Sequence, residues 1–230
     1  MISLIPVEGI GEIAAGDEIA DLVLAAVELA DFDVLVVTQK VVSKAEGRLV
    51  PIDHHDLEAR RQLVLAESTR VLRERGDLVI SETRHGFVCA NSGVDLSNVA
   101  DGWAALLPVD PDRSARHIRD AIKARTGMTV GVIVSDTFGR AWRNGLTDVA
   151  IGCAGIAAVV DLRGTSDANG RELTVTEVCV VDELAAAAEL VKGKASGIPA
   201  VIVRGADRSW FRESSVRAEV VRSAGQDLFR

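Results

Sequence analysis

The sequence has few aromatic residues and no excess of positive charge. Only 3% of its 230 residues are aromatic and none is tyrosine, so platforms for stacking nucleic-acid bases are scarce. Lys and Arg number 26 against 34 Asp and Glu, which gives a formal net charge of −8. A nucleic-acid surface needs a basic patch, and we therefore expect no nucleic-acid partner.

Cysteine, histidine motifs and long apolar runs are also scarce. The three cysteines lie singly in apolar stretches without C-x-x-C spacing, which predicts reduced, buried thiols. No H-x-x-x-H or H-E-x-x-H spacing occurs, which argues against a zinc hydrolase. No apolar run is long enough to span a bilayer, and no basic leader precedes an apolar core. We therefore expect a cytoplasmic protein that does not associate with membranes.

Apolar and charged segments alternate in a pattern typical of an α/β or mixed α+β fold, and we treat residues 1–230 as one functional unit. Strands are expected over these ranges: 2–7, 77–83, 86–93, 128–136 and 198–205. Residues 33–48 should form a buried strand that runs into a polar loop. Helices are expected over these ranges, with a further charged helix at the end: 17–30, 56–75, 113–125 and 181–191. Asp112 or Ser114 should cap the third of these helices.

A glycine pattern near the start imitates a dinucleotide-binding motif. Gly9, Gly11 and Ala14 match G-x-G-x-x-[GA] after a strand. In that motif the helix begins within the pattern, so that its first amides face the pyrophosphate. Here Gly16 and Asp17 restart the backbone later, so we expect no dinucleotide site, although the loop could still pass close to a ligand.

Two lysines follow the expected strand at residue 33 onward. Lys40 and Lys44 alone fit a solvated loop, because lysine is normally exposed. Ligands collect at strand ends in α/β sheets, which favours a binding role instead. No G-x-x-x-x-G-K-[ST] is present, so a P-loop is excluded.

Two further strand ends carry acids that suit a hard cation. In "ANSGVDLSN", Asp95 is surrounded by amides and hydroxyls, which could equally form a turn. In "VIVSDTFGRAWRNG", Asp136 and Thr137 end an apolar run, and a carboxylate beside a hydroxyl commonly holds Mg²⁺ near a nucleotide phosphate. An aspartyl-phosphate phosphatase would need a second acid where Phe138 stands. A shared metal site at Asp95 and Asp136 is therefore the better hypothesis.

Arginine and histidine side chains near these acids are further candidates. Arg140 and Arg143 could neutralise phosphate or carboxylate through bidentate bonds. His85 lies between two expected strands and is the histidine retained as a possible ligand contact.

Taken together, six segments resemble the coenzyme F420-0:L-glutamate ligase family. In chain order they read "PVEGIGEI", "VVSKAEGR", "ANSGVDLSN", "VSDTFGRAWRNG", "DANGREL" and "GIPAVIVRG". The resemblance covers essentially the whole chain. It implies a GTP-dependent ligase that adds L-glutamate to coenzyme F420-0, with F420-1 as a further acceptor candidate, through γ-glutamyl amide bonds. It also implies a family-specific, non-Rossmann α/β fold and an intertwined homodimer, and in actinobacterial members a flavin-reductase-like domain follows.

The resemblance also implies roles for individual residues. Asp95 and Asp136 should hold Mg²⁺ or Mn²⁺, Thr137 should assist at a second divalent ion, and K⁺ is a further candidate cation. Nucleotide contacts are implied for these residues: Ile10, Gly11, Glu12, Ile13, Gln39, Lys40, Lys44 and Asn98. The catalytic candidates are Asp95, Asp136, Arg140 and Arg143, the two arginines from their charge alone.

One segment departs from the family pattern. In "VKGKASGIPAV", Lys192 or Lys194 stands where relatives carry an acid or an amide. A cation cannot ligate a metal, so the second metal position is in doubt, and contact with nucleotide phosphates is an alternative role for these lysines.

A carboxylate is a poor acyl donor, so we expect the ligase to activate F420-0 as an acyl phosphate before glutamate attacks. Two other functions stay open. One is a non-catalytic, metal-dependent nucleotide-binding module, and the other is a metal-dependent phosphohydrolase that releases phosphate without glutamate.

Overall fold

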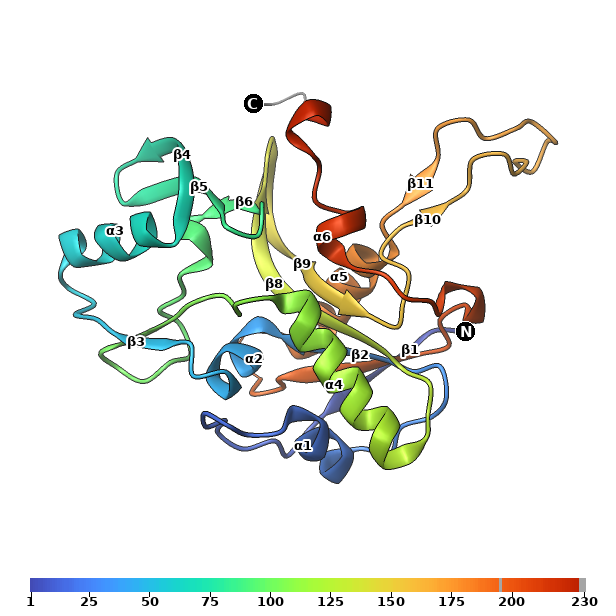
Figure 1. Cartoon of the computed structure of the whole chain (residues 1–230), viewed down its shortest axis with the longest axis horizontal. Helices are drawn as coiled ribbons and strands as arrows, with labels where there is room; N and C mark the ends of the chain where they lie inside the picture. Colours follow the sequence, from blue (N-terminus) through green and yellow to red (C-terminus); the bar gives the residue numbers. More distant parts are fainter. Residues whose placement is uncertain (195, 228–230) are drawn as a thin grey trace.

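A five-stranded mixed sheet lies at the centre of the computed structural model, which describes residues 1–194 and 196–227 (Figure 1). Its strands, in spatial order, are β1 (Ser3–Val7), β12 (Ala200–Arg204), β2 (Val34–Thr38), β8 (Gly131–Arg140) and β9 (Arg143–Ala154). Strands β2 and β8 pair in parallel, and the other neighbours in this sheet pair antiparallel. The predicted mixed α/β class is confirmed.

Helices cover the sheet, whose central strands are buried along their length. Each residue of Val34–Val37 is buried, as is each residue of Ala200–Val203, which is typical of strands covered on both faces. Figure 1 shows α4 (Pro111–Thr126) in front of the sheet, while α5 (Val180–Lys192) packs against β9 and β12 from behind. Helix α1 (Ile19–Ala26) packs on α4, and the short α6 (Val216–Glu219) packs on β9.

Smaller elements flank this sheet on two sides. One group comprises α2 (Gln39–Ala45), β3 (Leu49–Pro51), α3 (Leu57–Ala66), β4 (Ser68–Arg75), β5 (Leu78–Thr83), β6 (Val88–Ala90), the 3₁₀ turn η1 (Asn91–Gly93) and β7 (Trp103–Ala105). On the opposite side, β10 (Val160–Asp161) and β11 (Glu177–Val178) form a ribbon that stands away from the sheet (Figure 1). The 3₁₀ turns η2 (Arg208–Trp210) and η3 (Ala224–Gln226) lie near the end of the chain.

The strongest sequence patterns are confirmed. The strands expected over 2–7, 77–83, 128–136 and 198–205 are β1, β5, β8 and β12. The helices expected over 113–125 and 181–191 are α4 and α5. Helix α1 begins at Ile19, beyond the glycine pattern of residues 9–14, as the restart at Gly16 and Asp17 predicted.

Two predicted segments are wrong in type. The polar loop expected after β2 is the helix α2, whose polar residues Gln39 and Ser43 face inward and donate hydrogen bonds to the Leu106 carbonyl at 3.0 and 2.6 Å. The helix expected over 56–75 ends at Ala66, and the rest is β4, which pairs with β5. In both cases tertiary partners override the local pattern.

Details at helix ends also differ from expectation. Helix α4 is capped by Asp110, whose carboxylate accepts the Arg113 amide at 3.0 Å. Asp112 instead accepts the amides of Cys153 and Val216, at 2.9 and 2.8 Å, and so ties β9 and α6 to α4. The charged helix expected at the end of the chain is limited to the four residues of α6.

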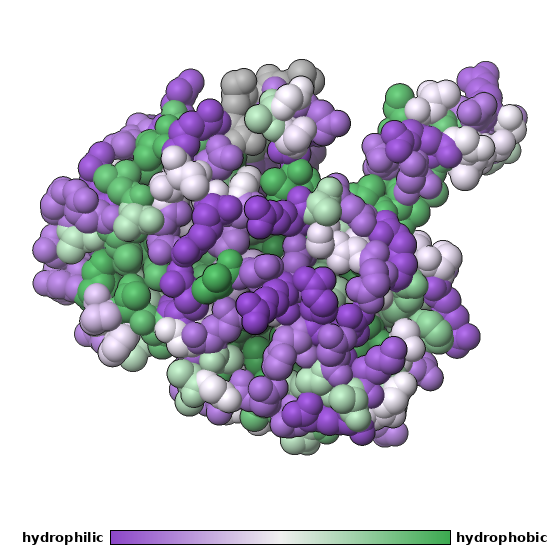
Figure 2. Space-filling view, viewed as in Figure 1, coloured by the Kyte–Doolittle hydropathy of each residue, from purple (hydrophilic) through white to green (hydrophobic). Residues whose placement is uncertain are grey.

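Hydrophilic side chains cover the exposed face of α4 in the view of Figure 2. None of the helices among the described residues combines the length and apolar character needed to cross a bilayer.

The three cysteines should react slowly with thiol reagents in the folded chain. Burial raises the pKa of Cys89, Cys153 and Cys179 to about 12 each, and all three are free thiols. Because the thiolate is the reactive form, titration with Ellman's reagent at pH 8 should be slow until guanidinium is added. Rapid reaction of the native chain would contradict this burial.

Candidate active site

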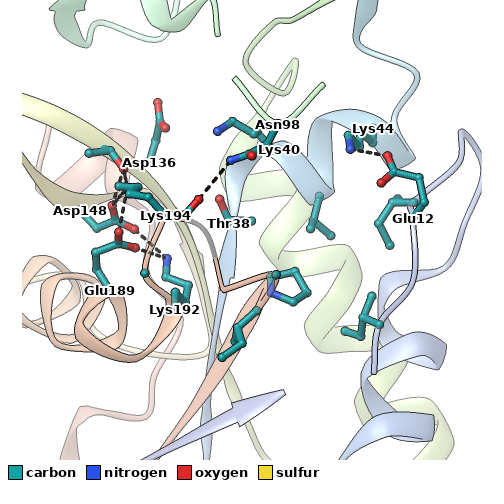
Figure 3. A pocket seen from close by; sticks show the side chains of 18 of the residues that line it. Glu12, Thr38, Lys40, Lys44, Asn98, Asp136, Asp148, Glu189, Lys192 and Lys194 are labelled. Carbon is teal, nitrogen blue, oxygen red and sulfur yellow. Dashed lines mark hydrogen bonds and ion pairs between the residues drawn. The ribbon is translucent and has the colours of Figure 1, made fainter. Parts of the chain in front are cut away.

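A cavity of about 510 Å³ opens at the end of β2, beside the middle of β8 (Figure 3). Parallel pairing places Thr38, the last residue of β2, opposite Ser135, so Asp136 and Thr137 of β8 lie at the same edge of the sheet. From β2 the chain enters α2, whereas β8 continues as far as Arg140. The cavity therefore lies between α2 and the β8–β9 pair, and the loops before α1 and after α5 complete its wall.

Most of the predicted site residues line this cavity. They are Ile10, Gly11, Glu12, Ile13, Lys40, Lys44, Asn98, Asp136 and Thr137. Asp95 lies beside them, because its Oδ2 is 2.8 Å from the Lys40 ammonium. Four segments that are distant in sequence therefore converge, as a shared ligand site requires.

Other predicted residues lie outside the cavity wall. Gln39 is buried and its amide donates to Ser43 and to the Leu106 carbonyl, so it supports α2 from inside. Arg140 and Arg143 face each other across the exposed turn between β8 and β9. His85 stacks on Phe87, and its Nε2 lies 2.9 Å from the Pro108 carbonyl.

Each acid that lines this cavity has a lysine partner, with a single exception among the described lining residues. Lys44 pairs with Glu12, Lys194 with Glu189 at 2.8 Å, and Lys192 with Asp148 at 2.7 Å. Asp136 lines the same cavity and forms no ion pair within the described part of the chain.

Asp136 is consequently the acid whose ionisation is most opposed. Burial raises its pKa to about 7, and the negative charges of Asp95 and Asp148 add to the effect. Asp95 behaves differently: burial opposes its ionisation, but hydrogen bonds from Lys40 and the Ser97 amide hold its pKa below the usual value. The influence of Asp95 on Asp136 indicates that the two carboxylates lie within electrostatic reach of each other.

This arrangement suits one hard divalent cation bound together with phosphate. Among the described residues, no three His, Cys, Asp or Glu side chains form a group that could hold a metal. Mg²⁺ is commonly held by one or two carboxylates, with water and substrate phosphates as the other ligands. Asp95 and Asp136 match that donor set, and a cation between them would stabilise the ionised form of Asp136, whose pKa is raised mainly by burial and further by the neighbouring carboxylates.

A buried ion pair forms part of the cavity wall. The side chains of Lys192 and Asp148 are each 3% exposed, and the ammonium also lies 2.7 Å from the Ser135 hydroxyl. Asp148 accepts the hydroxyls of Ser135 and Thr137 at 3.0 and 2.6 Å. Burial opposes ionisation of Asp148, but Lys192 holds its pKa below the usual value. Of the two lysines in the departing segment, Lys194 is thus the one exposed to the cavity.

Asp148 and Glu189 were not predicted as site residues. Asp148 appears in the sequence as one acid inside the apolar stretch "LTDVAIG", and an acid in a buried strand needs a partner. Its partner is set by the pairing of β9 with β8, where Asp148 lies opposite Thr137. Glu189 precedes Lys192 by one helical turn, which is an ordinary spacing for a surface ion pair.

Comparison with known proteins identifies the family. The sequence matches the F420-0:Gamma-glutamyl ligase family over residues 9–205. The chain belongs to this family. The coenzyme F420:L-glutamate ligase of Methanothermobacter thermautotrophicus is 43% identical over 100% of this chain and 99% of its own length. Ligases of the same name from Methanopyrus kandleri and Archaeoglobus fulgidus are 42% and 41% identical, covering 95% and 100% of this chain and 94% and 96% of their own lengths. The resemblance found in the sequence is thereby confirmed.

In this member of the ligase family, replacing Lys192 by methionine should destabilise the fold. Removing one partner of a buried ion pair leaves an uncompensated charge, which costs about 3–5 kcal/mol. Urea denaturation of Lys192→Met should show this loss, and Lys192→Met/Asp148→Asn should recover part of it. Lys123→Met, on the exposed side of α4, is the control and should remain within about 0.5 kcal/mol of wild type. Equal stability of Lys192→Met and wild type would contradict the importance of the pair.

Asp136→Asn should stabilise the metal-free chain at pH 8. With a pKa of about 7, folded Asp136 binds its proton more tightly than the unfolded chain does, so its stabilising contribution is lost as pH rises through 7. Asparagine avoids this loss, which amounts to at most about 4 kcal/mol at pH 8. Urea denaturation in EDTA should show a higher free energy of unfolding for Asp136→Asn than for wild type, and the difference should shrink as pH falls from 8 to 5. A gain independent of pH would contradict the assigned cause.

Proposed function

We propose that the chain is a GTP-dependent ligase that adds L-glutamate to coenzyme F420-0, with F420-1 as a further acceptor, through γ-glutamyl amide bonds. The observation that carries this proposal is a lysine-lined cavity of about 510 Å³ with Asp136 in its wall and Asp95 beside it on Lys40. Support also comes from the names and close similarity of the archaeal relatives.

Asp95 and Asp136 would hold one divalent cation, Mg²⁺ or Mn²⁺. Such an ion supplies electrostatic stabilisation to the phosphoryl oxygens during transfer. Thr137 is the candidate ligand for a second divalent ion, and K⁺ is a candidate monovalent ion. An ion on Asp95 would compete with Lys40 for the carboxylate, which would release Lys40 for the triphosphate.

The proposed chemistry has two steps. A carboxylate oxygen of F420-0 attacks the γ-phosphorus of GTP, the bond from that phosphorus to the β,γ-bridging oxygen breaks, and GDP leaves. The product is an acyl phosphate, whose carbonyl carbon is then attacked by the amine of L-glutamate. Inorganic phosphate leaves with the former carboxylate oxygen, the amine loses its proton, and an amide bond remains.

The chain's own residues bring these anions together. Triphosphate, acceptor carboxylate and glutamate repel one another, and the protein carries a net charge of −8. Lys40 and Lys44 extend from α2 into the cavity, where their ammonium groups can bind phosphate oxygens. Asn98 joins the Asp95 loop to the loop after α5 through a 3.5 Å hydrogen bond to the Lys194 carbonyl. Arg140 and Arg143 are proposed to bind the parts of the substrates that extend beyond the cavity.

A homodimer is part of the proposal. Trp142 and Leu146 on the β8–β9 hairpin are 82% and 67% exposed, and side chains of this kind are commonly buried between subunits. The hairpin also carries both arginine candidates, so a subunit interface there would lie close to the site.

The decisive experiment measures GDP and product together. The purified chain is incubated with F420-0, L-glutamate, GTP and Mn²⁺, and products are separated by liquid chromatography with mass detection. We expect GDP release that requires both F420-0 and glutamate, together with γ-glutamylated product. Asp95→Asn and Asp136→Asn should each slow turnover by at least about 100-fold, the scale of losing one transition-state contact. Asp167→Asn, in the β10–β11 ribbon, is the matched control and should retain activity.

Other outcomes would favour other functions. Phosphate release without glutamate would indicate a phosphohydrolase. Metal-dependent GTP binding without GDP release would indicate a non-catalytic nucleotide-binding module. Near-native turnover of Asp136→Asn in Mn²⁺ would refute the metal-binding role of that residue.

A further inference from the structure

The loop after α5 places the Lys194 ammonium at the Thr137 hydroxyl. The family resemblance implies this hydroxyl as a ligand of a second divalent ion. The Lys194 ammonium contacts Thr137 Oγ1, and it lies 2.8 Å from Glu189 Oε1 and 3.5 Å from Asp148 Oδ1 (Figure 3). An ammonium has three hydrogens to donate, and three oxygen acceptors surround this one. Two of these three acceptors are carboxylates, so the ammonium is held at this position as an ion pair.

The Thr137 hydroxyl already has two partners in this arrangement. It donates its hydrogen to Asp148 Oδ1 at 2.6 Å and accepts a hydrogen from Lys194. A metal bound to Thr137 would have to displace the ammonium from its oxygen. Because the two cations would repel each other at such short range, they cannot share the position.

Lys192 makes a second metal less favourable still. Its buried ammonium lies 2.7 Å from Asp148 Oδ2 and thereby neutralises the carboxylate that stands behind Thr137. The negative charge that would attract a divalent ion to Thr137 is therefore already balanced by two lysines of the chain. Asp136, by contrast, forms no ion pair among the described residues.

We propose that the Lys194 ammonium is the second cation of this site, so that the chain binds one divalent ion, at Asp95 and Asp136, instead of two. This inference rests on the proposed metal-dependent ligase function. It assigns Lys194 as a positioning residue that holds Thr137 and Glu189 without metal. It also predicts that the oxygens of Thr137, Glu189 and Asp148 become available to a metal once the lysine is removed.

Counting bound Mn²⁺ tests the proposal without measuring turnover. Each protein is dialysed to equilibrium against Mn²⁺ and a non-hydrolysable GTP analogue, and bound manganese is measured by electron paramagnetic resonance and by elemental analysis. We expect one Mn²⁺ per wild-type chain and two per Lys194→Gln chain. Lys194 is 60% exposed, so the variant should fold, and circular dichroism checks this.

Arg125→Gln is the matched control. It removes the same charge and likewise leaves an unpaired carboxylate, that of Asp21, but the pair lies outside the cavity. It should bind one Mn²⁺, as wild type does. A second Mn²⁺ in this control would overturn the inference, because loss of any positive charge would then suffice.

The remaining outcomes separate this inference from the proposed function. Two Mn²⁺ per wild-type chain would overturn the inference and leave the metal-dependent ligase intact. One Mn²⁺ in Lys194→Gln, with weaker binding of the GTP analogue, would overturn it in favour of contact between Lys194 and phosphate. Absence of bound Mn²⁺ from wild type would overturn both the inference and the proposed metal-dependent reaction.

Discussion

Parallel pairing between β2 and β8 determines where the site forms. Because Thr38 lies opposite Ser135, the chain delivers the lysines of α2 and the carboxylate of Asp136 to the same edge of the sheet. Strand β8 then continues beyond this edge and keeps its pairing with β9, which brings Asp148 opposite Thr137. The antiparallel neighbour β12 returns from the loop after α5, so that loop closes the cavity. The positions of the α2 lysines and of Asp136 both depend on this register between β2 and β8.

Charge balance is the second constraint on the site. The protein is acidic, yet the acids that line the cavity are compensated locally, each by a lysine from another part of the chain or from the next helical turn. Such pairing costs desolvation, and it leaves few charges free to attract an unspecific cation. Asp136 is the described exception among these acids, and burial raises its pKa because no ion pair offsets the loss of water. The cavity therefore combines lysines suited to phosphate with one acidic position suited to a metal.

Local patterns predicted the strands and the main helices, but the details of the site depend on contacts between distant residues. The apolar run of β8 and the alternation of α4 with strands are visible in the sequence, since they follow from burial and helical period. Helix α2 was predicted as a loop because its inward residues are polar. The Gln39 amide nitrogen and the Ser43 hydroxyl both donate there to the Leu106 carbonyl, which lies more than sixty residues away in the chain. Asp148 escaped prediction for the same reason, because its partners come from β8, α5 and the loop after α5 and cannot be read from its neighbours in the sequence.

The backbone explains how one short segment supplies two lysines with different surroundings. Gly193 separates Lys192 from Lys194 and has a φ of 58°, a left-handed conformation that favours glycine and that ends α5. The turn directs Lys192 inward to Asp148 and leaves Lys194 at the cavity. A tethered ammonium is present at any metal concentration, whereas a second ion must be recruited from solution. It carries one positive charge instead of two, so it offsets less of the triphosphate's charge. An ammonium in place of a second ion would thus make the site simpler to assemble, and Lys40 and Lys44 could supply the remaining charge.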